Sequence, residues 1–151
     1  MKKDTTIEII CGLLILLFVY TALSKLLAYR SFTTVLGKSP LIQGKAALVA
    51  WLLPTIELIA SALLLMPSTR KMGLYASFFL MLLFTLYIAY MLLFTQNLPC
   101  SCGGAIGRLT WKQHLVFNIL FTALAFVGAR LHGDVAHKGD MSDKKSMPQF
   151  L

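Results

Sequence analysis

Charged residues are scarce in this chain, and acidic residues are the rarest of them. Only 13% of the 151 residues are charged and 6 are Asp or Glu, whereas 58% are hydrophobic. The mean hydropathy of +0.76 is higher than that of ordinary soluble domains. The composition therefore excludes that class and indicates a membrane protein, with one domain expected at this length.

Cysteine is also rare, since 3 in the whole chain are too few for the disulfide framework of a small secreted protein. Two of them, Cys100 and Cys102, are separated by a single residue. A disulfide that closes so small a ring stabilises a fold little, because the loop-entropy contribution grows with loop length. Strain also makes such a bond easier to reduce. The pair is therefore better suited to electron transfer than to holding the fold together.

A basic stripe interleaved with aromatic residues is missing, so the net charge of +8 does not predict nucleic-acid binding. Lys and Arg fall between and beyond the apolar runs, as the flanking charges of membrane helices do. No internal repeat or low-complexity tract occurs, and the inverted repeats typical of many transporters are therefore also missing.

Long apolar runs predict an all-α fold, an integral membrane four-helix bundle. We expect spans at about residues 7–28, 46–66, 72–98 and 111–131, with a kink at Pro54 in the second. A T-x-x-Q capping box at Thr110 predicts the start of the fourth span. Residues 29–45 are rich in turn signals and are expected to form a loop. Residues 132–151 are expected to form a polar, disordered cytoplasmic tail.

The distribution of basic residues predicts the orientation in the membrane. Four spans place both termini on one side. Lys and Arg are more numerous in the N-terminal segment, the second connection and the tail than in the other two connections, which favours cytoplasmic termini. The segment with Cys100 and Cys102 then faces the periplasm or its equivalent, where disulfides form and persist.

Basic residues follow the cysteine pair closely. Positive charge beside a cysteine favours its thiolate, so Arg108 and His114 are candidates to tune its reactivity, and His114 also to relay a proton. The alternative is that Arg108 and Lys112 are interfacial anchors, and for His114 both interpretations stay open. A closed zinc site needs four ligands, so we favour redox chemistry and expect no metal.

Two ionisable residues lie within or at the edge of spans, Glu57 near mid-membrane and Lys25 about one turn from the outer face. Their axial gap is on the order of 10 Å, so a direct pair needs helix tilt or a kink. One interpretation is that they bind a quinone or carry protons. The other, which we favour, is a polar tie between the first two spans. We expect Asn118 to bond another helix and Cys11 to be buried as a small apolar residue.

The sequence Pro-Cys-Ser-Cys-Gly-Gly at residues 99–104, with the run from Arg108 to His114, resembles the MauE family of DoxX-like membrane proteins. Ser24-Lys25-Leu26 and Pro54-x-x-Glu57 are similar to wider DoxX-like patterns. The resemblance covers about residues 7–131 and implies a four-helix bundle in the bacterial inner membrane. It also implies support for disulfide formation in methylamine dehydrogenase, together with a thioredoxin-like periplasmic protein.

These patterns predict a membrane-embedded thiol–disulfide redox protein in which Cys100 and Cys102 cycle between dithiol and disulfide. The expected partners are a thioredoxin-like protein and a disulfide-containing secreted client, with a quinone as electron acceptor and no covalently bound cofactor. Vitamin K epoxide reductase-like enzymes are similar but carry an extra loop cysteine pair, which this chain lacks. The alternatives are a non-catalytic assembly factor and a small transporter, the latter supported only by Glu57 and Lys25.

Overall fold

The computed structural model describes the backbone of residues 2–38, 42, 44–94 and 111–146, and the side chains of 4–38, 42, 44–94 and 112–133. The described residues form helices and no strand: α1 Lys2–Leu27, α2 Tyr29–Gly37, α3 Ala46–Leu65, α4 Arg70–Phe94 and α5 Trp111–Ser146. Four helical stretches are long and apolar enough to cross a membrane: Asp4–Leu27, Ala46–Leu65, Arg70–Phe94 and Lys112–Gly133. The prediction of an all-α membrane bundle is confirmed.

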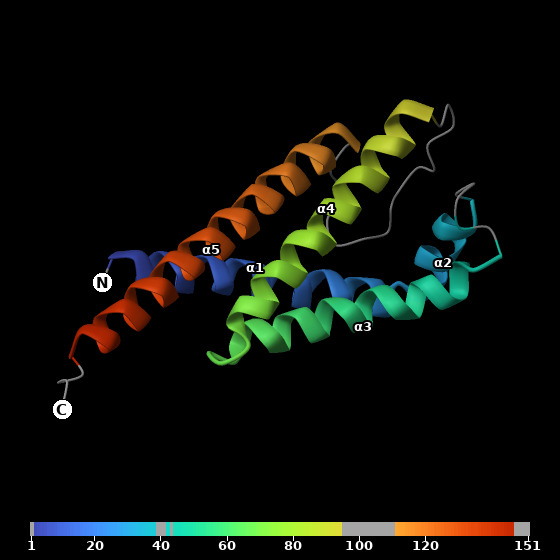
Figure 1. Ribbon diagram of the computed structural model, residues 1–151. Helices are drawn as coiled ribbons and strands as arrows, with labels where there is room; N and C mark the ends of the chain where they lie inside the picture. Colours follow the sequence, from blue (N-terminus) through green and yellow to red (C-terminus); the bar gives the residue numbers. More distant parts are fainter. Residues whose placement is uncertain (1, 39–41, 43, 95–110, 147–151) are drawn as a thin grey trace.

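The four long helices form a ring in which each contacts two neighbours. The most extensive contacts join α4 to α5 and α1 to α3, and further contacts of α3 with α4 and of α1 with α5 close the ring. Figure 1 shows α4 and α5 running obliquely to α1 and α3. The bundle end where α1 begins is called the terminal end here, and the end where α4 finishes and α5 begins is called the loop end. Both chain termini lie toward the terminal end (Figure 1).

Close packing at the terminal end depends on two glycines. A Cβ atom added at Gly73 would lie 2.8 Å from the backbone nitrogen of Leu64, so α3 and α4 approach closely only because residue 73 has no side chain. A Cβ at Gly128 would lie 3.0 Å from side-chain atoms of Ile10 and Leu74. Small residues at such crossings let helices pack tightly where lipid supplies no hydrophobic driving force.

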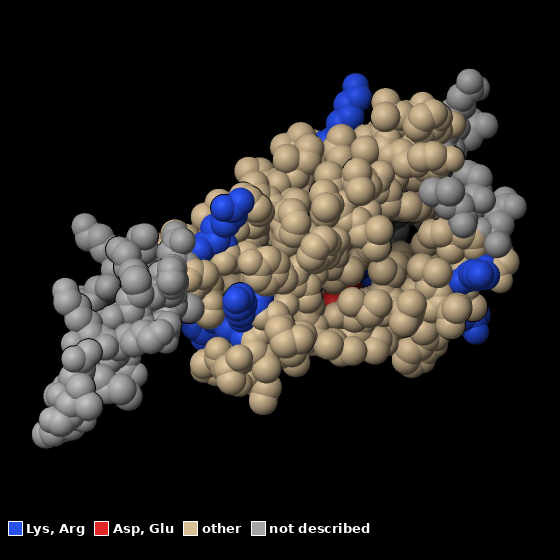
Figure 2. All heavy atoms as spheres, viewed as in Figure 1, with Lys and Arg blue, Asp and Glu red and all other residues tan. Residues whose placement is uncertain are grey.

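Most of the surface of the spans faces outward. Only 22–33% of the residues in the most apolar stretch of each span are buried inside the protein. Large apolar side chains, among them Leu16, Phe79 and Leu93, are exposed. Figure 2 shows the described basic side chains mainly toward the two ends of the bundle. This is the distribution expected when lipid tails surround the middle of the bundle and water its ends.

The prediction of a loop over residues 29–45 was wrong for its first half. Helix α2 is amphipathic, packs against α3 and buries Leu36. Phe32 and Leu36 are four positions apart, a helical spacing that outweighs the turn signals, which begin only at Gly37.

Helix α5 continues beyond the fourth span, further than expected. Helix α5 reaches Ser146, where a polar, disordered tail was expected from residue 132. Asp134 and Asp140 each precede a lysine by four positions in the sequence, and this spacing favours a helix despite Gly133 and Gly139.

Candidate functional site

Lys25 and Glu57 form an ion pair that joins α1 to α3. The Lys25 ammonium donates a hydrogen bond to Oε1 of Glu57. The Glu57 side chain is 1% exposed and the Lys25 side chain 13%. The long lysine stem spans the axial gap expected from helix rise, since such a side chain can lie along an apolar surface and extend its charged end. The polar tie favoured by the sequence is therefore present.

Two aromatic rings complete the surroundings of the Lys25 ammonium. Its nitrogen lies 5.1 Å from the ring centroid of Phe84 in α4. It lies 5.9 Å from that of Phe32 in α2. The negative face of an aromatic ring attracts a cation, and this attraction offsets part of the cost of removing the charge from water. Sequence reasoning missed both residues, because a single phenylalanine carries no distinguishing signal, whether in the apolar run around Phe84 or in the more polar segment around Phe32.

His114 brings the fifth helix to the same place. It lies in the first turn of α5, is half-buried and interacts electrostatically with Lys25. The groups around the Lys25 ammonium therefore come from the other four described helices. Phe32, Glu57 and Phe84 lie beside it, and His114 of α5 lies within electrostatic range. Three of the site residues predicted from sequence, Lys25, Glu57 and His114, come together here. We call this group, with Phe32 and Phe84, the Lys25 cluster.

The second oxygen of the Glu57 carboxylate is the chemically unusual atom of the cluster. Oε2 is buried and has no hydrogen-bond partner among the described residues. A buried carboxylate oxygen without a donor costs free energy, because it has lost water and gained nothing in exchange. The Thr21 hydroxyl is a polar neighbour of this carboxyl group. Oε2 can accept a hydrogen bond from a water or from the hydroxyl of a ligand, or it can take up a proton itself.

Among the described residues, the hydrogen bond of the Asn118 amide stays within its own helix, where a bond to another helix was expected. Its side-chain amide donates to the carbonyl oxygen of His114, 2.9 Å away in the same helix. The link between α4 and α5 is made one turn further on, where the hydroxyl oxygens of Thr85 and Thr122 are 3.2 Å apart. The Thr122 hydroxyl also approaches the Asn118 carbonyl oxygen at 2.7 Å.

The remaining predicted site residues, Cys100, Cys102 and Arg108, lie outside the described residues, so their roles stay predictions. The described chain stops at Phe94 in α4 and resumes at Trp111 in α5, both at the loop end (Figure 1). Cys11 is a free thiol within the buried core, as expected.

In the described part of the chain, five helices, four of them apolar enough to cross a bilayer, and a buried ion pair define a small multi-pass membrane protein. The family model described as methylamine utilisation protein MauE matches residues 3–131. The chain therefore belongs to the MauE family. Neither the curated proteins nor the solved structures contain a match to this chain.

Proposed function

We propose that this MauE-family protein is a thiol–disulfide redox protein that supports disulfide formation in extracytoplasmic proteins. The observation that carries the proposal is the position of Cys100 and Cys102 in the sequence between α4 and α5. The described ends of these two helices lie at the loop end, the same end as the Lys25 cluster. Exchangeable sulfurs can take up electrons from another thiol protein, and buried ionisable groups within spans commonly mark proton paths.

The proposed reaction begins with the Cys100–Cys102 disulfide. A thiolate of a thioredoxin-like partner, or of the client itself, attacks one sulfur and displaces the other as a thiolate. A second thiolate of the attacking protein then resolves the mixed disulfide. The attacking protein is thereby oxidised to a disulfide, and Cys100 and Cys102 are both reduced. Positive charge at Arg108 favours the thiolate forms involved.

A quinone in the bilayer is the proposed electron acceptor. Reoxidation of the two thiols releases two electrons and two protons, and a quinone that accepts both becomes a quinol. Buried ionisable residues within spans commonly mark proton or ligand paths. In this proposal, Glu57 Oε2 and His114 pass the protons, and Lys25 holds the Glu57 carboxylate in place. The unpartnered Oε2 atom supports this role.

The proposed location is the bacterial inner membrane, with cytoplasmic termini and a periplasmic loop end. The distribution of Lys and Arg supports this orientation. The family description supports a client in methylamine utilisation, and the disulfide-containing small subunit of methylamine dehydrogenase is the client we propose.

Thiol trapping in intact cells tests the proposed chemistry. The Cys100→Ser/Cys102→Ser variant should insert normally and abolish disulfide formation in the client. Cys11→Ser is the matched control and should keep full activity, because the Cys11 side chain is buried in the core. Full activity of the double variant would contradict the redox proposal and favour a non-catalytic assembly factor.

The proposed orientation needs a separate measurement. A maleimide that cannot cross membranes should label reduced Cys100 and Cys102 from outside the cell. Labelling only after the cytoplasm is opened would place the pair on the wrong side for this function.

A further inference from the structure

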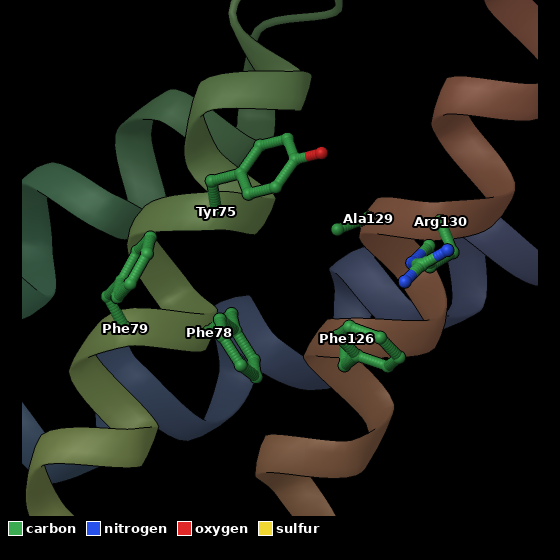
Figure 3. Close-up of a pocket in the computed structure, with 6 residues that line it drawn as sticks. All are labelled: Tyr75, Phe78, Phe79, Phe126, Ala129 and Arg130. Atoms are coloured by element: carbon green, nitrogen blue, oxygen red, sulfur yellow. The ribbon is translucent and has the colours of Figure 1, made fainter.

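An aromatic groove lies between α4 and α5 toward the terminal end, well away from the Lys25 cluster. It is lined by Tyr75, Phe78, Phe79, Phe126, Ala129 and Arg130 (Figure 3), and its volume is about 90 Å³. Binding pockets for whole small molecules usually measure roughly 300–1,000 Å³. The groove is therefore suited to part of a flexible chain rather than to an enclosed substrate.

The groove has an apolar side and a polar side. Their order along the helices matches the order of lipid tails and headgroups in a membrane. Arg130 lies three residues before Gly133, where the fourth span ends, and Tyr75 lies five residues after Arg70, where the third begins. These two residues are therefore at the level of the headgroups. Phe79 and Phe126 lie about one turn deeper. Both phenylalanine side chains are exposed on the outer surface of the spans, where lipid tails pack.

The polar side of the groove is positively charged. The Arg130 guanidinium carbon lies 5.0 Å from the centroid of the Phe126 ring, and this contact positions an otherwise exposed side chain. Figure 3 shows the Tyr75 hydroxyl directed across the groove toward α5. Lys71 precedes Tyr75 by four residues and so lies on the same face of α4. None of the residues that line the groove is acidic.

We infer that this groove binds an anionic phospholipid. An acyl chain lies along Phe79 and Phe126, and the phosphate accepts hydrogen bonds from Arg130 and Tyr75. The planar guanidinium matches the oxygens of a phosphate, and basic sites between membrane helices are suited to acidic headgroups. A zwitterionic lipid brings an ammonium group into this cationic site and binds less well. The inference is independent of the proposed redox function.

The charge of the groove also argues against a second copy of the chain as its occupant. A symmetric dimer through this face would bring the same patch of each copy together. The Arg130 side chains would then approach one another with no acidic residue in either groove. Like charges at close range oppose such a contact.

Native mass spectrometry of the purified protein, released from detergent with added lipid, tests the inference. The wild type should retain phosphatidylglycerol about fivefold more than phosphatidylcholine, the effect of one basic residue at a membrane surface. Arg130→Gln should abolish this preference, and Arg130→Lys should keep part of it. Phe126→Ala should weaken retention of both lipids. Lys45→Gln removes the same charge from an exposed residue at the loop end and should change nothing.

Three results would overturn the inference. The first is equal retention of the two lipids by the wild type, and the second is an unchanged preference in Arg130→Gln. The third is full displacement of phosphatidylglycerol by millimolar inorganic phosphate, which would mean that the site binds the anion alone. A wild-type dimer that Phe126→Ala dissociates, with an unchanged lipid preference in Arg130→Gln, would instead assign the groove to a second copy. Because Arg130 is exposed, thermal unfolding of this variant should match the wild type.

Discussion

The two ends of the bundle are held together by different interactions. At the terminal end, α3 meets α4 at Gly73, and α5 meets α1 and α4 at Gly128, through close apolar contacts. Toward the loop end, groups from the other four described helices lie around the Lys25 ammonium of α1. A buried ion pair is an expensive way to join helices, and ionisable residues within spans commonly mark functional sites. The comparison therefore poses a direct question: whether the Lys25–Glu57 pair only ties α1 to α3 or also takes part in the proposed chemistry.

The largest loss of stability is expected when one member of the ion pair is replaced. Lys25→Met leaves the Glu57 carboxylate buried without its partner, and loss of one member of a buried pair costs about 3–5 kcal/mol. Lys25→Met/Glu57→Met removes both charges and should recover most of that loss. Denaturant unfolding in detergent micelles measures the free energy of unfolding of both variants. Equal destabilisation by the single and the double variant would show that the pair contributes packing rather than charge.

The double variant also separates the two interpretations of the pair. If the pair only ties α1 to α3, a folded Lys25→Met/Glu57→Met protein should form client disulfides at the normal rate. If Glu57 passes protons during reoxidation, the same protein should accumulate with Cys100 and Cys102 reduced. Thiol trapping of the variant in growing cells distinguishes these outcomes.

A smaller effect is expected at the terminal end from a single added methyl group. In Gly73→Ala the new Cβ would meet the backbone of Leu64, so α3 and α4 must separate, at a cost of about 1–3 kcal/mol. Gly12 is the matched control, because a Cβ there would have nothing within 4 Å. Gly12→Ala should be neutral or stabilising by up to about 1 kcal/mol through helix propensity. Thermal unfolding compares the stability of the two variants. Similar losses of stability in both would show that the close α3–α4 crossing is not what requires glycine at residue 73.

The smallest effect is expected from the hydroxyl contact between α4 and α5. Thr85→Val removes the contact with Thr122 and should cost about 0.6 kcal/mol, an average value for polar contacts between membrane helices. In the control, Thr55→Val, the lost hydroxyl bonds only the Trp51 carbonyl oxygen of its own helix. An unfolding curve for each variant gives the difference in the free energy of unfolding. A loss above that of Gly73→Ala would mean that this polar contact stabilises the bundle more than the close α3–α4 crossing at the terminal end does.

The sequence was sufficient to predict the four spans, because the length and hydropathy of these segments exceed what helices of soluble proteins require. It also identified Lys25, Glu57 and His114, since ionisable residues in apolar runs are conspicuous. It favoured a tie between Lys25 and Glu57 but did not predict that His114 lies near them, because helix rise gives depth along each axis but not the oblique crossing of helices. Phe84 could not be distinguished from other phenylalanines of its span, since only its position over the Lys25 ammonium sets it apart.

The turn residues that follow helix α2 concealed it in the sequence. In the structure this helix lies beside Lys25 and limits the access of water to its ammonium group. Phe32 places an aromatic ring beside the Lys25 ammonium, while Lys38 and Lys45 are exposed just beyond this helix. An amine-acylating reagent in the surrounding water will therefore modify Lys38 and Lys45 first, and Lys25 only when α2 moves away from α3. The ratio of these acylation rates measures how often the buried charge becomes accessible, and a docked redox partner that shifts α2 would change this ratio.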